Sequence, residues 1–240
     1  MSPTGTTDKE SIRQRIWDDL EESGLARFPF PPHGRIPNYE NAAAAADRLA
    51  DEPEWTEAAA IKANPDAPQL PVRRRALREG KTVYMAVPRL RDERCFLELD
   101  PADLESYDEA TTVSGSSKHG RPVLPDEVER IDLIVTGSVA VTDGGGRIGK
   151  GEGYSDLEYA ILRELDLVDA ETPVATTVHE RQVIDDAAAL DDHDVPMDLI
   201  VTPERVRRPD AREPPTGIDW GRLEAERLDE IPVLERLREA

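Results

Sequence analysis

One continuous stretch decides the fold: IDLIVTGSVAVTDGGGRIGKGEGYSDLEYAILREL, residues 131–165. It opens with an almost uninterrupted apolar run over 131–141, which is typical of a central parallel strand covered on both faces. Asp143 and the three glycines after it turn the chain. Three more glycines, at alternate positions, lead into a segment over 155–166 whose apolar residues repeat with helical spacing. The stretch therefore predicts a strand, a glycine-rich turn and a helix in succession.

The rest of the chain alternates in the same way between helical and extended patterns. Capping boxes are expected to start helices at Thr7 and Ser155, and Asn41 is expected to cap another that ends near residue 50. Pro71 and Gly80 bracket a fourth helix. Buried strands are expected over residues 58–63, 82–87, 131–141, 173–178 and 199–202. Strands that alternate with helices predict a doubly wound α/β sheet.

Three segments are expected to lie outside this pattern. Residues 91–125 are mixed and loop-rich, with 114–120 as the mobile part. Residues 205–217 read as a charged, proline-bearing linker. An amphipathic helix follows over 220–239, with an interruption near Pro232. We therefore predict one large α/β domain with a C-terminal helical extension.

The composition is strongly acidic. There are 51 Asp and Glu against 30 Lys and Arg, which gives a formal net charge of −21 and a pI near 4.6. Such a chain repels nucleic-acid phosphates, so no nucleic-acid partner is expected. The acidic residues are spread along the chain, and lysine is scarce. This surface is expected of a halophilic protein, because molar salt screens self-repulsion beyond about 3 Å. An ordinary acidic cytosolic protein is the alternative.

The sequence lacks several other kinds of chemistry. The single cysteine, Cys95, excludes an internal disulfide and a multi-cysteine metal site. No apolar leader and no run near ~18 apolar residues occur, so we expect a cytoplasmic protein without membrane association. A monomer is also expected. The four histidines have no metal-ligand spacing, and His179 is interpreted as a polar residue at a strand end. No serine or cysteine nucleophile motif is present.

The segment RIGKGEGY, residues 147–154, is the first candidate binding motif. Its alternating glycines leave no Cβ over a tight turn, so backbone N–H groups can converge on an anion. The following helix N-terminus favours negative charge, and Arg147 and Lys150 add full positive charges. The spacing fits neither a Walker A loop nor a dinucleotide fingerprint. A glycine-rich hairpin with charged filler is an equal alternative on spacing alone.

Two further sets of charged residues are candidates. Lys9 and Arg13 share one face of the first helix, so they can clamp a polyphosphate if that helix is docked. A solvated basic edge paired with local carboxylates is the alternative. Asp156 follows the glycine turn and Asp194 precedes a buried strand. Both are candidate ligands for Mg²⁺, which needs only one or two carboxylates besides phosphates and water.

Together these pieces resemble the 5-formyltetrahydrofolate cyclo-ligase (methenyltetrahydrofolate synthetase) family over about residues 8–206. Residues 132–154 are similar to the family's strand, turn and Arg-x-Gly-x-Gly-x-Gly-Tyr signature, and Lys9-x3-Arg13 is similar to its N-terminal Lys-x3-Arg. Further matches are Gly80-Lys81-Thr82-Val83, Gln182-Val183, His193-Asp194 and Val201-Thr202-Pro203. The segment 35–39 looks nearest to the divergent methenyltetrahydrofolate-synthetase-domain branch.

The resemblance implies a three-layer Rossmann-like open sheet of mostly parallel strands, similar to NagB, RpiA and the CoA transferases. It implies a cyclo-ligase-like α/β domain over 8–206, with a linker and C-terminal helix over 207–240. It also implies an ATP- and Mg²⁺-dependent enzyme acting on a folate-type small molecule. Phosphate is transferred to the formyl oxygen of 5-formyltetrahydrofolate, N10 attacks, and phosphate leaves to give 5,10-methenyltetrahydrofolate.

The resemblance also assigns roles to individual residues. Tyr154 would lie near the reacting formyl group and, with Lys150, is the candidate catalytic residue. Asp156 and Asp194 would hold Mg²⁺. ATP would be bound by Lys9, Arg13, Arg147, Gly149, Lys150, Gly151, Glu152 and Gly153.

Two departures from the family pattern keep other functions open. The family's Gly-Tyr-Tyr-Asp has Ser155 in place of the second tyrosine. The family's folate-contacting Glu-x-x-Thr strand is not recognisable over 58–68, where Asp66 is the only acid. One alternative is an ATP-dependent enzyme for another pterin-like or heterocyclic substrate. The other is a non-catalytic nucleotide-binding module.

Overall fold

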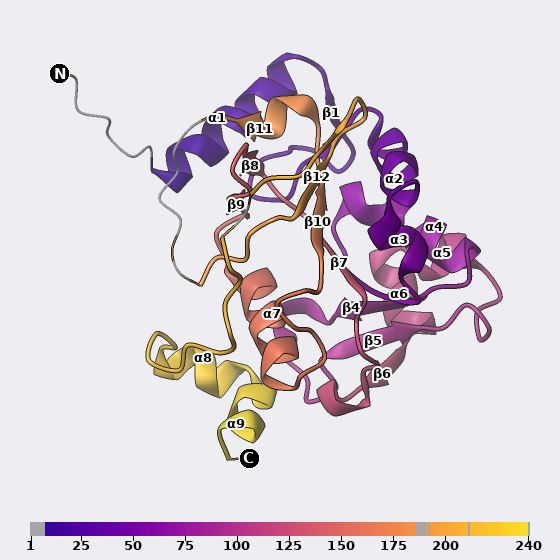
Figure 1. Cartoon of the computed structure of the whole chain (residues 1–240), viewed down its shortest axis with the longest axis vertical. Helices are drawn as coiled ribbons and strands as arrows, with labels where there is room; N and C mark the ends of the chain where they lie inside the picture. The colour runs from indigo at the N-terminus through magenta and orange to yellow at the C-terminus, as the bar shows by residue number, and fades with distance from the viewer. Residues whose placement is uncertain (1–7, 186–190, 192, 211, 240) are drawn as a thin grey trace.

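The fold is built on a twisted, mostly parallel sheet (Figure 1). The computed structural model describes residues 8–185, 191, 193–210 and 212–239. In sheet order the strands are β13 (Val206–Arg207), β12 (Leu199–Val201), β10 (Val174–Thr177), β7 (Leu133–Thr136), β3 (Ala60–Ala63), β4 (Thr82–Ala86), β5 (Phe96–Leu99) and β6 (Arg121–Val123). Neighbours from β12 to β4 are parallel, whereas β13, β5 and β6 pair antiparallel at the edges.

Helices cover both faces of this sheet and make three layers (Figure 1). One face is covered by α2 (Ala42–Ala50), α3 (Pro53–Glu57) and α4 (Leu70–Arg78). The other is covered by α7 (Tyr154–Glu164) beside the C-terminal α8 (Ala225–Glu230) and α9 (Pro232–Glu239). Alternate strand residues serve the two layers, since Val83 and Met85 pack on the α2–α4 side and Tyr84 packs on the α7 side. The predicted mostly parallel α/β architecture is therefore confirmed.

A smaller unit holds the N-terminal helix. α1 (Lys9–Glu22) packs the predicted stripe Ile12, Ile16 and Leu20 into a core shared with β8 (Ala140–Thr142), β9 (Arg147–Ile148) and β11 (Val183–Ile184). These strands form a separate sheet in the order β11-β8-β9. The other described elements, apart from short 3₁₀ turns, are β1 (Ala26–Arg27), β2 (Asn38–Tyr39), α5 (Tyr107–Ala110) and α6 (Val113–His119).

The predicted strand over 131–141 is divided in two, β7 and β8. Between them the carbonyl oxygens of residues 137–139 accept hydrogen bonds from side chains. Arg147 Nη1 donates to the first at 3.0 Å, and Gln182 Nε2 donates to the other two at 3.0 and 3.1 Å. The backbone therefore leaves the main sheet at this point, where Thr136, Gly137 and Ser138 interrupt the apolar residues.

Three predicted helix caps differ from the structure. Asn41 precedes α2, but its backbone is left-handed with φ 64° and its side chain makes no capping hydrogen bond. Ser155 lies inside α7, because Gly153 takes the N-cap position with φ 70°. Asp8 caps α1, and Thr7 lies outside the described residues. The helices themselves begin close to where they were expected.

Three predicted segment types also need correction. Residues 114–119 are helical, because the Thr112 hydroxyl caps α6 by accepting the Gly115 N–H at 3.0 Å. The linker over 205–217 contains β13, which pairs with β12 through its main chain. The C-terminal helix begins at Ala225, and the predicted interruption before Pro232 is confirmed. The NagB-like label and the domain boundary at 206 stay predictions.

Within the described ranges, no helix is long and apolar enough to cross a membrane.

The single cysteine is not available for reaction. Cys95 is completely buried in the core on the α7 side of the sheet. Burial raises the pKa of its thiol to about 12, so the reactive thiolate is scarce at neutral pH.

A buried ion pair ties the central strand β3 to α7. Lys62 Nζ contacts the carboxylate of Glu158, and the two side chains are only 2% and 8% exposed. Lys62 also donates a hydrogen bond to Asn64 Oδ1 at 2.9 Å. Because water cannot solvate either charge, each depends on the other. The pair fixes α7 over the carboxyl end of β3.

We predict that Lys62→Met lowers the free energy of unfolding by about 3–5 kcal/mol, because it leaves Glu158 buried and unpaired. The double variant Lys62→Met with Glu158→Leu should recover much of this loss. Urea denaturation followed by circular dichroism measures both. Lys118→Met, which removes an exposed ion pair with Glu109, is the control and should change stability far less. A loss in Lys62→Met no larger than in this control would contradict the prediction.

Candidate functional site

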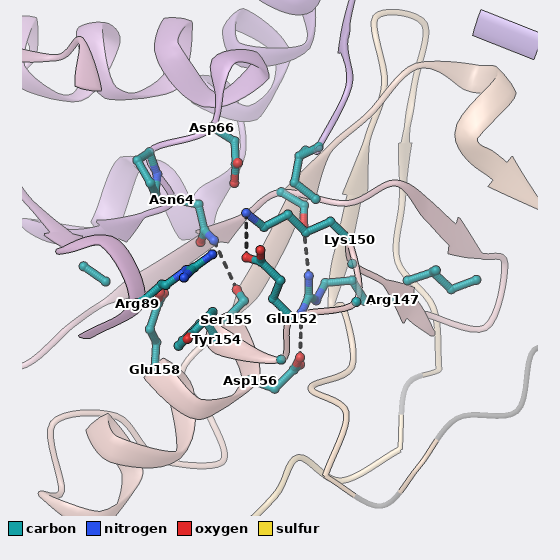
Figure 2. Close-up of a pocket in the computed structure, with 18 of the residues that line it drawn as sticks. Asn64, Asp66, Arg89, Arg147, Lys150, Glu152, Tyr154, Ser155, Asp156 and Glu158 are labelled. Atoms are coloured by element: carbon teal, nitrogen blue, oxygen red, sulfur yellow. Dashed lines mark hydrogen bonds and ion pairs between the residues drawn. The ribbon is translucent and has the colours of Figure 1, made fainter. Parts of the chain in front are cut away.

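The candidate site lies where the strand order of the main sheet reverses. From β3 the sheet continues to β4 on one side and to β7 on the other. Open α/β sheets bind ligands beyond the carboxyl ends of their strands at such a point. A cleft of about 430 Å³ opens there, between the loops after β3, β4 and β7 and the glycine turn (Figure 2).

The cleft contains every residue that the sequence analysis gave as a candidate for ATP binding, catalysis or metal binding. It is lined by Lys9, Arg13, Arg147, Gly149, Lys150, Gly151, Glu152, Gly153, Tyr154, Asp156 and Asp194. The most distant of these, Lys9 and Asp194, are 185 residues apart and in direct contact. The predicted convergence around the glycine turn is therefore observed, while the roles of the residues stay predictions.

The glycine turn requires backbone conformations that other residues rarely adopt. Gly151 has φ 100° and Gly153 has φ 70°. A Cβ on Gly151 would also lie 3.3 Å from Cζ of Arg13. The turn ends at α7, whose first backbone N–H groups have no partner within the helix. An anion in the cleft can therefore meet main-chain donors at this end.

Arg147, at the start of the glycine turn, links the loop after β7 to the first turn of α7. Its side chain is only 6% exposed. Nη1 donates to the carbonyl oxygen of Gly137 at 3.0 Å, and Nη2 donates to Asp156 Oδ2 at 2.7 Å. Asp156 Oδ1 also accepts the backbone N–H of Val195 at 3.2 Å. Arg147 and Asp156 thus hold each other beside the cleft and position the first turn of α7.

The two cations of α1 face the cleft rather than open solvent. Arg13 Nε donates to the Gly149 carbonyl oxygen at 2.7 Å, and the side chain is 12% exposed. Lys9 Nζ contacts Asp194 at 2.6 Å and Asp191 at 3.3 Å, and its side chain is 22% exposed. Arg13 Nη1 also pairs with Glu10 at 2.9 Å, so the carboxylate pairing of the alternative is observed, although neither cation is freely solvated.

Charge in the cleft differs from charge in the whole chain. Five cationic side chains and five carboxylates line it, although acids far outnumber bases overall. Lys150 extends between Asp66 and Glu152 and pairs with the latter at 2.8 Å (Figure 2). Arg89 has no ion-pair partner among the described residues and is held at φ 60° after β4. The cleft is thus a locally favourable place for an anion on an acidic protein.

A group of possible metal ligands lies at one end of the cleft. Asp191, His193 and Asp194 each offer a ligand atom, and these atoms lie within 4.8 Å of one another. The predicted pair was Asp156 with Asp194, so Asp191 and His193 are additions. Their short spacing just before β12 is the signal in the sequence, whereas the histidines alone have no metal-ligand spacing. Carboxylate oxygens are the donors that Mg²⁺ prefers.

Sequence reasoning gave no role to the loop after β3. Asp66 is half-buried in the cleft wall, and burial of its carboxyl raises its pKa, an effect partly offset by the nearby Lys150 and Arg73. Arg73 is 1% exposed and donates to the carbonyl oxygens of Asp66 at 3.0 Å and Pro65 at 3.2 Å. An arginine on the buried face of α4 was the signal for this support.

His179 does not line the cleft. Its Nδ1 accepts the Arg181 N–H at 3.2 Å, and its ring meets the edge of Tyr39 with centroids 6.0 Å apart. Burial lowers its pKa. The interpretation of His179 as a polar residue at a strand end is confirmed.

Comparison with known proteins fits this geometry. The profile of the 5-formyltetrahydrofolate cyclo-ligase family matches residues 6–203. The chain belongs to this family. The cyclo-ligase fold also appears in the solved structure of Aquifex aeolicus 5,10-methenyltetrahydrofolate synthetase, with a TM-score of 0.51. That likeness covers 90% of this chain and 99% of the other, at 19% identity, and supports the fold alone.

Two relatives place the chain within the cyclo-ligase family. It is 45% identical over 236 residues to the methenyltetrahydrofolate synthase domain-containing protein of Mus musculus, covering 96% of this chain and 63% of that protein. It is 39% identical over 235 residues to the protein of the same name in Homo sapiens, covering 96% and 61%. The predicted branch is confirmed. The chain spans less than two thirds of the length of these relatives.

The raised pKa of Asp66 makes the free energy of unfolding of this cyclo-ligase family member depend on pH. A carboxyl whose folded pKa lies above its unfolded value, near 3.8, is protonated more readily in the folded state. Stability from this group is therefore fully present below the unfolded pKa and is lost as pH rises through the folded pKa. We predict that Asp66→Asn is more stable than the parent at neutral pH, and that the gain shrinks on acidification.

Urea midpoints across the acidic-to-neutral range measure the effect. Asp103→Asn, an exposed acid outside the cleft, is the matched control and should show no such trend. A gain that stays constant with pH would show that the effect does not come from ionisation of Asp66. A loss of stability at neutral pH would show that its carboxylate is favourably placed.

Proposed function

We propose that this chain is an ATP- and Mg²⁺-dependent enzyme that converts 5-formyltetrahydrofolate to 5,10-methenyltetrahydrofolate. One observation carries the proposal: Lys9, Arg13, Arg147 and Lys150 converge on a glycine-lined cleft at the switch point of a cyclo-ligase-family fold. Several cations around one turn suit a polyphosphate better than a neutral ligand. A halophilic source, cytoplasmic location and monomeric state stay predictions from the sequence.

ATP would bind by exchange of charged partners. Before binding, Lys9, Arg147 and Lys150 are each held by a carboxylate of the cleft. Phosphate oxygens would take over these cations, and the N–H groups at the start of α7 would add main-chain donors. Because the cations are already positioned, little reorganisation is needed when charge moves during phosphoryl transfer.

The carboxylates released in this exchange suit a divalent ion. Asp194 lies within reach of Asp191 and His193, and Asp156 approaches the same segment through Val195. These oxygen donors fit Mg²⁺. Magnesium bound here would neutralise charge on the phosphates. Lys9, freed from Asp194, would be available to a phosphate oxygen.

The formyl-folate would occupy the wall between Tyr154 and Asp66. Lys150 extends across this space, so its ammonium can stabilise negative charge on the formyl oxygen as phosphate is transferred to it (Figure 2). N10 then attacks the formyl carbon, and phosphate leaves. Asp66 can accept hydrogen bonds from ring N–H groups of a pterin, and Arg73 keeps its loop rigid.

We predict that the protein, in molar KCl with ATP and Mg²⁺, converts 5-formyltetrahydrofolate to a product with methenyl absorbance. Lys150→Ala and Asp156→Asn should each lower kcat/KM by about 10²–10³-fold, because each removes a preorganised charge. Lys118→Ala, an exposed lysine on α6 outside the cleft, should leave the rate unchanged. Stopped-flow absorbance gives the rates, and calorimetry gives ATP affinity.

The outcomes separate the alternatives. Stoichiometric ATP binding without methenyl formation would reject the folate substrate and favour another heterocycle, found by an ATPase screen. If the protein neither binds ATP nor turns over any substrate, the proposal that it is an enzyme is rejected. Equal rates in Lys150→Ala and Lys118→Ala would reject the assignment of the cleft.

A further inference from the structure

The C-terminal extension lies beyond the part of the chain that matches the family profile, which ends at residue 203. It is nevertheless firmly packed on the α7 side of the molecule (Figure 1). Ile231 and Leu234 are completely buried in the core that contains α7. The backbone N–H of Ile218 donates to Glu164 at the end of α7, at 3.2 Å. Short α8 is therefore held in a fixed place beside the cleft.

One side chain of α8 reaches the glycine turn. The guanidinium of Arg227 donates through Nη2 to the carbonyl oxygen of Glu152. Its Cζ lies 4.4 Å from the ring centroid of Tyr154, a cation–π contact. Nη2 also lies 3.9 Å from where a Cβ on Gly153 would stand. A residue far along the chain thus contacts Glu152 and Tyr154 and passes close to Gly153 between them.

Arg227 and Tyr154 also share a second cavity. This cavity of about 250 Å³ is also lined by acidic residues in and just before α8, and it shares Arg89, Glu152 and Tyr154 with the main cleft. Tyr154 therefore lines both cavities, and the contact with Arg227 restrains its ring. Nη1 of Arg227 is buried without a hydrogen-bond partner among the described residues. Such burial is costly, so the stacked contact and the bond to Glu152 must offset it.

We propose that Arg227 is a positioning residue, which holds Tyr154 and the glycine turn in the geometry that receives ATP. The C-terminal extension is thereby part of the nucleotide site, although the family profile does not include it. This inference rests on the proposed function, since it assumes that the cleft binds ATP. Arg227 touches no reacting atom and acts through the carbonyl of Glu152 and the ring of Tyr154.

Hydrogen exchange of the full-length protein tests the contact without any assay of turnover. Arg227→Met keeps the side-chain length but removes the charge and the donors. Amide exchange in the peptide covering 149–157 should become at least about tenfold faster, as expected from losing a charge-assisted hydrogen bond. Arg227→Lys should be intermediate, since it keeps the charge but not the planar group. Arg238→Met, on exposed α9 surface, is the matched control.

Steady-state kinetics then distinguishes positioning from simple stability. In Arg227→Met the KM for ATP should rise about tenfold with a smaller change in kcat, and Arg227→Lys should restore part of it. A purely structural role would lower the active fraction, and hence apparent kcat, without moving KM. Exchange and KM for ATP equal to those of Arg238→Met would overturn the proposal. Faster exchange in a protein that never uses 5-formyltetrahydrofolate would retain the contact and reject only the substrate.

Discussion

The buried guanidinium of Arg147 is the interaction on which the cleft depends. It links the carbonyl oxygen of Gly137, where the chain leaves the main sheet, to Asp156 in the first turn of α7. A charge this poorly exposed is stable only while its partners remain in place. Arg147 holds the two segments that flank the glycine turn, and Arg13 of α1 donates a hydrogen bond to Gly149 within it. Two sheets and two helices are thereby brought to one place.

The pairing of charges in the cleft also suits an acidic protein. The chain as a whole carries excess negative charge, yet cations and carboxylates are equal in number around the cleft. Arg147 with Asp156 and Lys9 with Asp194 are partly shielded from solvent. Mobile ions screen such pairs less than exposed ones. The arrangement can therefore persist at salt concentrations that weaken surface ion pairs.

Much of the fold could be predicted from local pattern. The strands around 82–87, 173–178 and 199–202 and the helices after Asn41 and Pro71 appear within a residue or two of their expected bounds. Their apolar residues repeat at the period of the element, and the covering layers reinforce that period. Where side chains far along the chain decide the backbone, local pattern failed. The break after β7 depends on Arg147 and Gln182, and neither is visible in the apolar run itself.

The candidate site, like the fold, could be predicted where the signal is local in the sequence and not where it depends on distant residues. The glycine turn, Lys9 and Arg13 could be nominated as an anion site from their residue types and spacing, but only the family resemblance favoured this interpretation over the alternatives. Asp66 could not be given a role, since its environment depends on burial and on Arg73 from another helix. The role of Arg227 could not be predicted either, because no sequence motif links it to Tyr154, which it contacts only in the folded chain.

The complete burial of Cys95 has a practical consequence. With its thiol un-ionised at neutral pH, the native chain offers almost nothing to maleimides or other thiol reagents. A cysteine introduced on the surface of α8 or near the glycine turn would therefore be modified selectively, without first removing the native one. Spin labels or fluorophores placed in this way could follow the separation of the two segments in solution.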